Sequence, residues 1–573
     1  MDRSMELEVE DRLKELRITA MRSVSKKAAA NNLKSFNKIR MGLEASWMRE
    51  KTEFIEEHNK VLSLLRTNLP RTSSSGPVLT GHKQKKALAY AEVVKKLNHA
   101  RLNALRFNPA TAFRDSYTSL SVRESTGKIS IREIWDLVRM LAGEDIIHHS
   151  RKHRSISNEM SLVLGAKRYL EWRHVKYIMS RISEDPVLAA LGGEVVNLKQ
   201  IRAFLRVHLK DYGVLDFDAG HDACSPPPVD TTWQQIYFCM RAGYYDEART
   251  VASSSNASQE FAPLLNEWIT SGGMVSVEIA ATASDELDMM LRPVNVKGGA
   301  GYEKEKLLLY SLISGSRSLF DSLLEDQPTL FDTEEDFYWF RLSSIREPVG
   351  AASTVMNAGL EPYTLKDLQV YVNNSAPGTY TTNGADPLMY PYVLLLSIQL
   401  ITAIVYMSNE IGGEGYNIDA AHISIALADH GVLSEVAGAG QGIGVMDAYE
   451  KASRITKQYG SVNFLPDNLS MALEYYAQAA AVLGGGRLSW PIRGNVDQQR
   501  QRNLMLKHVL TELLMREGGI CLLLGSRGKE GELSRFFTDV EGRIQFLHEA
   551  AQQCQEVGLS DKSLEITNRI GDG

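Results

Sequence analysis

A pair of short helices joined by a glycine is the pattern that most constrains the fold of this chain. Residues 233–252 read WQQIYFCMRAGYYDEARTVA, in which Trp233, Ile236 and Tyr237 recur at helical spacing. Gly243 then supplies a turn, and the segment after it carries a narrow face of small residues suited to close packing. This pattern predicts an antiparallel helix pair, which must bury its apolar face by stacking on neighbouring pairs.

Similar glycine junctions recur around Gly315, Gly431 and Gly558. Their spacings share no common period, whereas a regular tetratricopeptide array would repeat about every 34 residues. Alternating runs of β-branched residues bounded by turns are scarce, and GTYTTNG, residues 378–384, is typical of a loop. We therefore predict an all-α fold, an irregular α-helical solenoid without a sheet of consequence.

The chain is predicted to have three parts. Residues 1–66 lack proline and are rich in helix-forming residues, which predicts a long, basic, coiled-coil-like helical arm. This arm is either a solvated surface or a site for an acidic partner. Residues 67–86 collect Pro, Ser and Gly and predict a flexible linker, and residues 87–573 form the predicted solenoid.

Charge and cysteine usage narrow the class of protein. The formal net charge is −6, which provides no global basic field, so we expect no direct binding of nucleic acid. Cys224, Cys239, Cys521 and Cys554 are too far apart for a zinc finger and are interpreted as small core residues in a reducing compartment. The charged N-terminus lacks the apolar segment of a signal peptide, which favours an intracellular protein.

Three segments are candidates for chemistry, and each has a better structural interpretation. GAGQGIG, residues 438–444, lacks the full dinucleotide-binding pattern and a preceding strand, so a loop is favoured. Gly528 and Lys529 lack the other residues of a phosphate loop and predict a surface turn. His148, His149 and His153 lie in a basic run without an evident further metal ligand. We therefore predict no catalytic, cofactor-binding or metal site and no enzymatic activity.

Two further segments concern helices. Ser130 and Glu133 have the spacing of a capping box at the start of an amphipathic helix. Residues 388–407, LMYPYVLLLSIQLITAIVYM, are long and apolar enough to be considered as a membrane span. Because Pro391 and Gln399 interrupt the run and no Lys or Arg flanks it closely, we expect a buried helix of the solenoid.

Several segments resemble the nucleoporin interacting component family, the inner-ring scaffold nucleoporins of the nuclear pore complex. They are PPPVDTTWQQIYFCMRAGYYDEA, DPLMYPYVLLLSIQLITAIVYM followed by DAAHISIALADHGVL, and QRNLMLKHVLTELLMREGG. Their order agrees with the family, and the resemblance covers most of the chain from Lys86 onward. It implies a bent solenoid of the ancestral coatomer element type that builds and spaces the inner ring and so supports protein import and RNA export.

The resemblance also implies partners and a location. The expected partners are the channel nucleoporin trimer, large scaffold nucleoporins and adaptor linker peptides, although the residues that bind them are unknown from sequence. The expected location is the nuclear envelope, with only indirect membrane contact and no transmembrane segment. Family members usually carry a longer N-terminal region, and the helical pattern here stops at residues 569–573, so we expect a chain shortened at both ends. A coatomer-like coat or tethering subunit is the alternative function, and a nucleotide-using enzyme is a third.

Overall fold

A computed structural model describes most of the chain from Gly81 onward. The described residues are 81–120, 128–145, 158–192, 196–218, 228–273, 275–292, 304–326, 330–346, 361–434, 445–483, 496–526, 529–537 and 539–571. All of them belong to one compact unit, Leu79–Gly573. The predicted arm, residues 1–66, lies outside the described residues. The predicted linker ends too late, because Gly81–Lys86 already belong to a helix.

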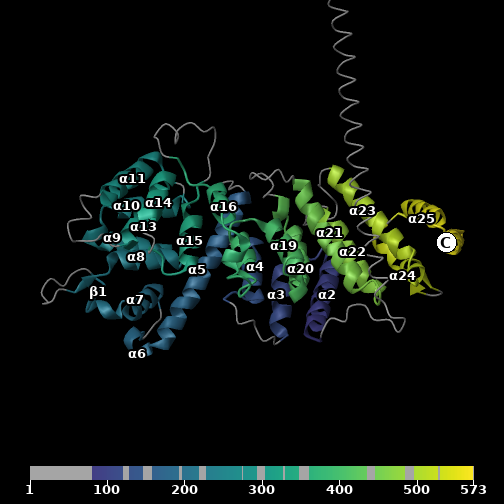
Figure 1. Cartoon of the computed structure of the whole chain (residues 1–573), viewed down its shortest axis with the longest axis horizontal. Helices are drawn as coiled ribbons and strands as arrows, with labels where there is room; N and C mark the ends of the chain where they lie inside the picture. The colour runs from purple at the N-terminus through teal and green to yellow at the C-terminus, as the bar shows by residue number, and fades with distance from the viewer. Residues whose placement is uncertain are drawn as a thin grey trace, which may run out of the picture. The chain divides into compact units, whose positions relative to one another are not determined.

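Helices make up nearly all of the regular structure in the described ranges, in agreement with the all-α prediction (Figure 1). The first four are α2 (Gly81–Leu102), α3 (Pro109–Ser119), α4 (Ile131–Leu141) and α5 (Asn158–Glu184). The next ten are α6 (Pro186–Ala189), α7 (Asn197–His208), α8 (Thr232–Arg241), α9 (Tyr245–Ser254), α10 (Ala262–Thr270), α11 (Val277–Leu291), α13 (Lys304–Ser314), α14 (Arg317–Asp326), α15 (Glu334–Ser344) and α16 (Leu365–Asn373).

The second half of the unit is also helical. It comprises α17 (Pro377–Tyr380), α18 (Met389–Leu396), α19 (Leu400–Asn409), α20 (Tyr416–Asp429), α21 (Val445–Asn463), α22 (Leu469–Leu483), α23 (Val496–Leu514), α24 (Gly519–Leu524), α25 (Val540–Glu556) and α26 (Ser560–Gly571). Short 3₁₀ turns lie between helices: η1 (Lys210–Tyr212), η2 (Asn256–Ser258), η4 (Gly412–Glu414), η5 (Val432–Ser434) and η7 (Glu532–Arg535).

Strands in the described ranges are limited to two small pairs. β1 (Leu215–Asp216) and β2 (Val229–Asp230) pair in parallel, with Leu215 opposite Val229. β3 (Gly525–Ser526) and β4 (Lys529–Glu530) pair antiparallel, which places Lys529 in a strand, whereas Gly528 of the predicted surface turn lies outside the described residues. Residues 378–384, predicted as a loop, begin with the last turn of α17 and then form turns.

The predicted helix pair and capping box are confirmed. α8 and α9 pack on each other, and Gly243 between them has a φ of +75° in the left-handed region that glycine tolerates best. Gly315, Gly431 and Gly558 also have positive φ at the ends of helices. At the start of α4, Glu133 N donates to Ser130 Oγ and Ser130 N donates to Glu133 Oε2.

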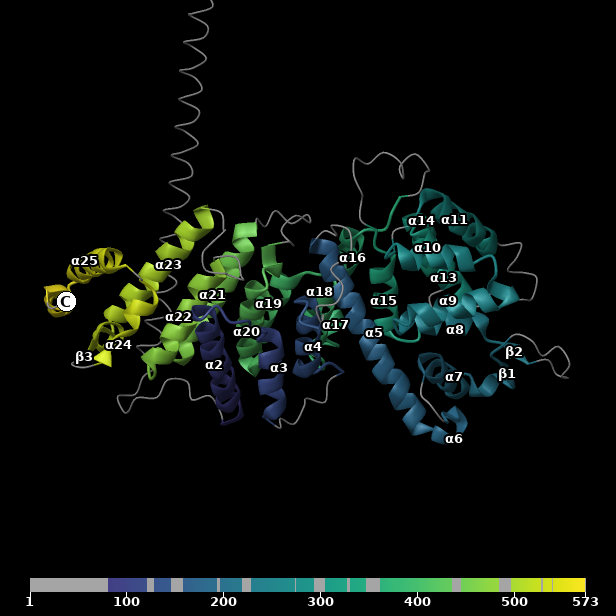
Figure 2. The ribbon, with the colours of Figure 1, turned by 180° about the vertical axis from the view of Figure 1, so that it is seen from behind.

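The chain runs outward and then returns to its starting helices. α2–α4 lead through α5 to α7–α16, and the later helices come back to lie against the early ones. α18 packs on α4 and α5, α20 packs on α3 and α4, and α22 packs on α2. Figures 1 and 2 show α2 and α3 beside α20 and α22 from opposite sides. One apolar core therefore extends from Ala87 to Val482, and a second joins α22–α26.

The apolar run at residues 388–407 is buried, as predicted, but it is not one helix. α18 ends at Leu396, and α19 begins at Leu400. Between them Ile398 adopts a φ of +57°, and its N–H donates to the carbonyl of Leu395, so the chain turns without leaving that buried donor unpaired. Among the described residues, no helix has both the length and the apolar character needed to cross a membrane.

Candidate functional site

A groove opens between helices that the sequence separates by more than 200 positions. It has a volume of about 1000 Å³ and is lined by residues of α4, α5, α15 and α18 and of the segments before α4 and α15. We call it the α4–α5–α15 groove. Its lining residues are Lys128, Ile129, Ser130, Arg132, Glu133, Asp136, Trp172, Arg173, His174, Lys176, Tyr177, Ser180, Asp332, Thr333, Glu334, Glu335, Tyr338, Met389 and Tyr392.

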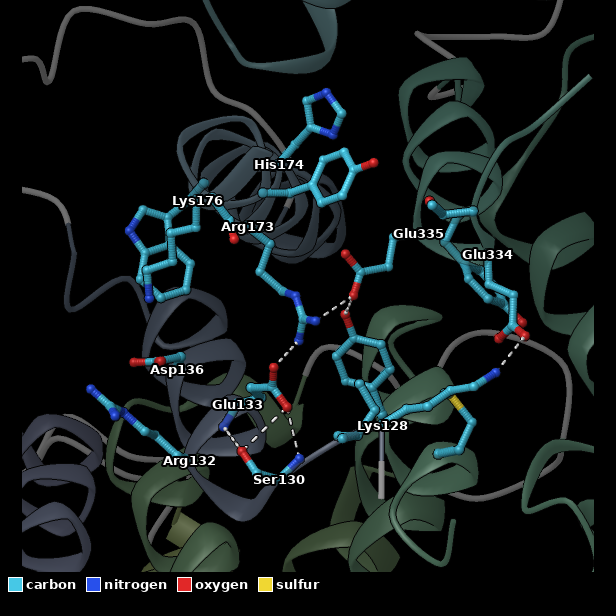
Figure 3. Close-up of a pocket in the computed structure, with 18 of the residues that line it drawn as sticks. Lys128, Ser130, Arg132, Glu133, Asp136, Arg173, His174, Lys176, Glu334 and Glu335 are labelled. Carbon is cyan, nitrogen blue, oxygen red and sulfur yellow. Dashed lines mark hydrogen bonds and ion pairs between the residues drawn. The ribbon is translucent and has the colours of Figure 1, made fainter. Parts of the chain in front are cut away.

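Arg173 is the central side chain of the groove, and it joins two walls (Figure 3). From α5, its Nη1 lies 2.6 Å from Glu133 Oε1 on α4, and its Nη2 lies 2.9 Å from Glu335 Oε1 on α15. Tyr392 on α18 donates its hydroxyl hydrogen to Glu335 at 3.3 Å. Because Glu133 also closes the capping box of α4, the start of that helix is fixed relative to α5 and α15.

Burial and pairing together set the pKa values of this cluster. Burial raises the pKa of Glu335, and the positive charges of Arg173 and Arg241 oppose that rise without cancelling it. Burial would lower the pKa of Arg173, but Tyr169, Tyr392 and the two neighbouring carboxylates raise it overall. The guanidinium therefore stays charged between its carboxylate partners.

Aromatic side chains line the groove beside the charged ones. Lys176 Nζ lies 3.4 Å from the centroid of the Trp172 ring, a cation–π contact on α5. The His174 ring stacks on Phe238 with centroids 5.9 Å apart. Burial, followed by the charges of Arg241 and His208, lowers the pKa of His174 well below its ordinary value, so its imidazole is neutral at physiological pH.

The rim of the groove carries both signs of charge. Lys128 Nζ lies 3.7 Å from Glu334 Oε1 across the opening, and both side chains are about two-thirds exposed. Arg132 and Lys176 lie on the α4 and α5 side, whereas Asp332 lies on the α15 side. Such a surface suits a polypeptide that offers apolar groups to the aromatic residues and charges of both signs to the rim.

The groove does not have the arrangement of a nucleophilic catalytic site. The Ser130 hydroxyl caps α4 and lies 3.2 Å from Glu133 Oε2, but that carboxylate is already bound by Arg173 and the Ser130 N–H. Nor do three His, Cys, Asp or Glu side chains of the described residues gather in a way that could hold a metal ion. What the groove offers chemically is recognition by packing, charge and hydrogen bonds.

The described part of the chain covers few of the residues that the sequence marked as candidates for chemistry. His148, His149 and His153 and the glycine-rich residues 438–444 lie outside the described residues, as does Cys224. Cys239 and Cys554 are buried, as predicted. The prediction for Cys521 is wrong, because this side chain is exposed on α24, a helix of six residues that turns only part of its surface to the core.

Ser130 and Glu133 are recognisable in the sequence as a helix cap, but their place in the α4–α5–α15 groove is not. Arg173 and Glu335 have no local signal, because they lie within ordinary charged helical segments and meet only after α5 and α15 pack. The available sign was the run of three acidic residues, Glu334, Glu335 and Asp336, in the first turn of a helix, and such a run more often reflects the helix dipole.

Comparisons with known proteins agree over almost the whole chain. The sequence pattern of the Nup93/Nic96 family matches residues 129–572. The nuclear pore complex proteins NUP93A and NUP93B of Arabidopsis thaliana are each 50% identical to this chain. Each alignment covers 98% of this chain and 68% of the relative's own length. The crystal structure of Nic96 SOL from Chaetomium thermophilum superimposes with a TM-score of 0.64 at 18% identity, covering 85% of this chain and 70% of that one.

Proposed function

The chain belongs to the Nup93/Nic96 family, and on this premise we propose that its helices link partner nucleoporins in the inner ring of the nuclear pore. It is a scaffold nucleoporin of the nuclear pore complex, located at the nuclear envelope, and its partners are other nucleoporins. The family is structural, and we propose that this member has no catalytic role. Its contribution to protein import and RNA export follows from building and spacing the pore.

The observation that carries the proposal is the 50% identity to two nuclear pore proteins over 98% of the chain. The coat or tethering alternative is not favoured, because helical stacking alone could serve either role whereas the similar sequences belong to nuclear pore proteins. We propose as partners the channel nucleoporin trimer, large scaffold nucleoporins and adaptor peptides.

The α4–α5–α15 groove supports the finer part of the proposal, the binding of an adaptor peptide. Its volume of about 1000 Å³ is large enough for several side chains of a partner segment. The ion pairs of Arg173 hold its walls before any partner arrives, which reduces the entropy lost on binding. The exposed pair of Lys128 and Glu334 is placed to select the direction and charge of the segment.

Localisation is the first test. The full-length protein, fluorescently tagged at its own gene, should give a punctate signal at the nuclear rim and co-purify with nucleoporins. A diffuse cytosolic signal, or co-purification with coat subunits in place of nucleoporins, would overturn the scaffold assignment.

The groove has a separate test that uses charge reversal on its rim. Glu334→Lys places two like charges across the opening, and the double variant Lys128→Glu with Glu334→Lys restores an opposite pair in reversed order. Both should weaken capture of a groove partner, measured by quantitative mass spectrometry of the purified complexes. Arg249→Glu, an exposed change on α9, is the control. If all variants retain the same nucleoporins, the groove is not the binding site, although the scaffold role would stand.

A further inference from the structure

The outward face of α2 carries lysines that form no ion pair with any residue the structure describes. Lys85, Lys95 and Lys96 are exposed on this helix, and Arg106 is exposed just beyond its end. None of these four side chains has an interaction with another part of the chain that would neutralise it. Glu92 is the single acidic residue of α2. The face is therefore basic and open to a partner.

The carboxylates that lie against α2 do not reach this outward face. They belong to α20 and α22, and all of them are buried: Asp419, Asp429 and Glu474. Each contacts a side chain on the inner side of α2, in order Lys86, Arg101 and Asn98. The positive charge of the exposed lysines is left uncompensated at the surface.

The exposed lysines share one side of α2 with two exposed leucines. At about 3.6 residues per turn, Lys85, Lys95, Lys96, Leu88 and Leu102 fall within about one-third of the helix circumference. They extend over roughly 26 Å of the helix axis at about 1.5 Å per residue. Leu88 is 53% exposed and Leu102 is 48% exposed. A flat surface could therefore touch all five side chains at once.

The spacing of the leucines favours a lipid surface over a docked protein helix. A docked helix needs apolar residues one turn apart, which form a continuous seam. Leu88 and Leu102 are about four turns apart. The exposed positions between them are all polar: Glu92, Lys95, Lys96 and His99. A fluid bilayer interface needs no seam, because single leucines can enter it while lysine ammonium groups stay at the headgroups.

Two further observations favour lipid headgroups as the anionic partner. A nucleic acid backbone would bind the lysines but leave Leu88, Leu102 and Leu105 without an apolar contact, and Leu105 is 61% exposed in the turn after α2. The chain is located at the nuclear envelope, so a lipid bilayer is part of its surroundings.

We propose that the outward face of α2 binds the surface of an anionic lipid bilayer. Lys85, Lys95 and Lys96 contact the headgroups, and Leu88 and Leu102 enter the boundary with the acyl chains. This peripheral contact is direct, whereas the family resemblance implied only an indirect one. It goes beyond the scaffold role and does not depend on peptide binding in the α4–α5–α15 groove.

The test measures binding of the purified full chain to lipid vesicles by co-sedimentation. One vesicle population contains phosphatidylcholine with about one-third phosphatidylserine, and the other contains phosphatidylcholine alone. We expect the anionic vesicles to bind at least roughly tenfold more tightly, because each lysine near such a surface strengthens binding about fivefold. Added salt should weaken binding to the anionic vesicles.

Charge removal places the contact on α2. The triple variant carries Lys85→Gln, Lys95→Gln and Lys96→Gln. It should bind the anionic vesicles at least roughly tenfold more weakly than the parent protein. The matched control removes the same charge from the basic residues 1–66 and carries Lys26→Gln, Lys27→Gln and Lys34→Gln. It should change binding less than about threefold.

A second pair of variants tests the leucines. Leu88→Gln with Leu102→Gln should weaken binding to the anionic vesicles roughly fivefold, because both side chains lose their apolar contact with the bilayer. The control is Val187→Gln with Val214→Gln, since these valines are 88% and 73% exposed on α6 and beside β1. It should leave vesicle binding unchanged. Thermal melting of all variants verifies that they are folded.

Four results would overturn the proposal. The first three are equal binding to the two vesicle populations, a lysine variant that binds no more weakly than its control, and a leucine variant that binds no more weakly than its control. The fourth is binding of an acidic Glu-Leu peptide or a single-stranded RNA oligonucleotide that is at least as tight and equally sensitive to the lysine variant. None of these results bears on co-purification with nucleoporins, so failure here is distinguishable from failure of the scaffold assignment.

Discussion

At the residue scale, a small set of buried polar side chains joins the first described helix to helices far along the chain. Lys86 on α2 is paired with Asp419 on α20, whose carboxylate is fully buried and also accepts from the Tyr90 hydroxyl at 3.1 Å. Trp135 on α4 donates to that hydroxyl at 2.8 Å. These contacts fix which face of α2 meets α20, because each partner would be left unpaired in another register.

Breaking the ion pair between Lys86 and Asp419 should destabilise the fold. Lys86→Met is expected to lower the free energy of unfolding by about 3–5 kcal/mol, because it leaves the Asp419 carboxylate buried without its counter-charge. Burial already raises the pKa of Asp419, so the loss should shrink as the pH falls and the carboxyl takes up a proton. Urea denaturation at two pH values measures both effects, with exposed Lys85→Met as the control. Equal stability of the two variants would contradict the structural role of the pair.

His422 should make the folded protein less stable as the pH falls, whereas the cost of losing Lys86 becomes smaller as the pH falls. Burial lowers its pKa to about 3, and its ring lies between the Ile418 carbonyl, which accepts from Nδ1, and the Tyr475 hydroxyl at Nε2. The unfolded chain therefore binds this proton at higher pH than the folded chain, near the ordinary value of about 6.5. Stability from this group is complete above that value and is lost as the pH falls toward 3.

The expected slope for His422 is about 1.4 kcal/mol for each pH unit within that window. The difference in the pH dependence of the free energy of unfolding between His422→Gln and the parent protein measures this contribution. His82→Gln, at an exposed position, is the control. Parallel stability curves for His422→Gln and the parent between pH 6 and pH 4 would show that the imidazole is not held neutral.

At the element scale, close helix crossings decide where the walls of the groove lie. α4 and α5 approach each other at Gly165, where an added Cβ would lie only 2.8 Å from the Met140 carbonyl oxygen. Glycine within a helix usually costs stability relative to alanine, so its presence in α5 indicates that packing outweighs propensity.

Gly165→Ala therefore tests that balance. We expect a loss of about 1–3 kcal/mol in the free energy of unfolding, since α4 and α5 must separate to admit the methyl group. Gly413→Ala is the matched control, because an added Cβ there meets nothing within 4 Å. Stabilisation by Gly165→Ala, measured by chemical denaturation, would mean that the crossing is looser than the structure indicates.

Local features of the helices could be predicted from the sequence, but the tertiary contacts between helices could not. Periodicity, the Ser130 cap and the turn at Gly243 depend on residues within a few positions of one another, so a short window contains their cause. The break at Ile398 was missed, because apolar periodicity does not encode a turn that tertiary packing stabilises. The groove could not be predicted from the sequence either, since Arg173 and Glu335 come together only through the packing of separate helices.

At the scale of the whole described unit, the return of the chain to its first helices makes α2 part of two regions at once. It packs on α3 early in the sequence and on α20 and α22 much later. Asn98 Nδ2 on α2 donates to Glu474 Oε2 on α22 at 2.6 Å, and Gln478 Nε2 on α22 donates to Asn98 Oδ1 at 2.7 Å. These hydrogen bonds reinforce the apolar contacts between the two helices. α2 should therefore stay in place without a covalent link to α3.

Cleavage after folding tests this expectation. A protease site inserted into the exposed connection between Leu102 and Pro109 would separate α2 from the rest of the chain. The two pieces should co-elute in size-exclusion chromatography. The same cleavage in a chain that carries Lys86→Met and Asn98→Ala should release the smaller piece. Its release from the cleaved parent protein would contradict a stable long-range attachment.

The distance between these partners also has a consequence for biosynthesis. Lys86 and Asp419 are separated by 333 residues, which a ribosome adding about 5–20 residues per second needs roughly 17–67 s to span. For most of that interval the part of α2 that contains Tyr90, Val94 and Leu97 has been synthesised, whereas α20 and α22 do not yet exist. The nascent chain therefore lacks, for tens of seconds, the helices that later cover this apolar face of α2. We expect it to depend on ribosome-associated chaperones that shield the segment until α20 and α22 have been synthesised.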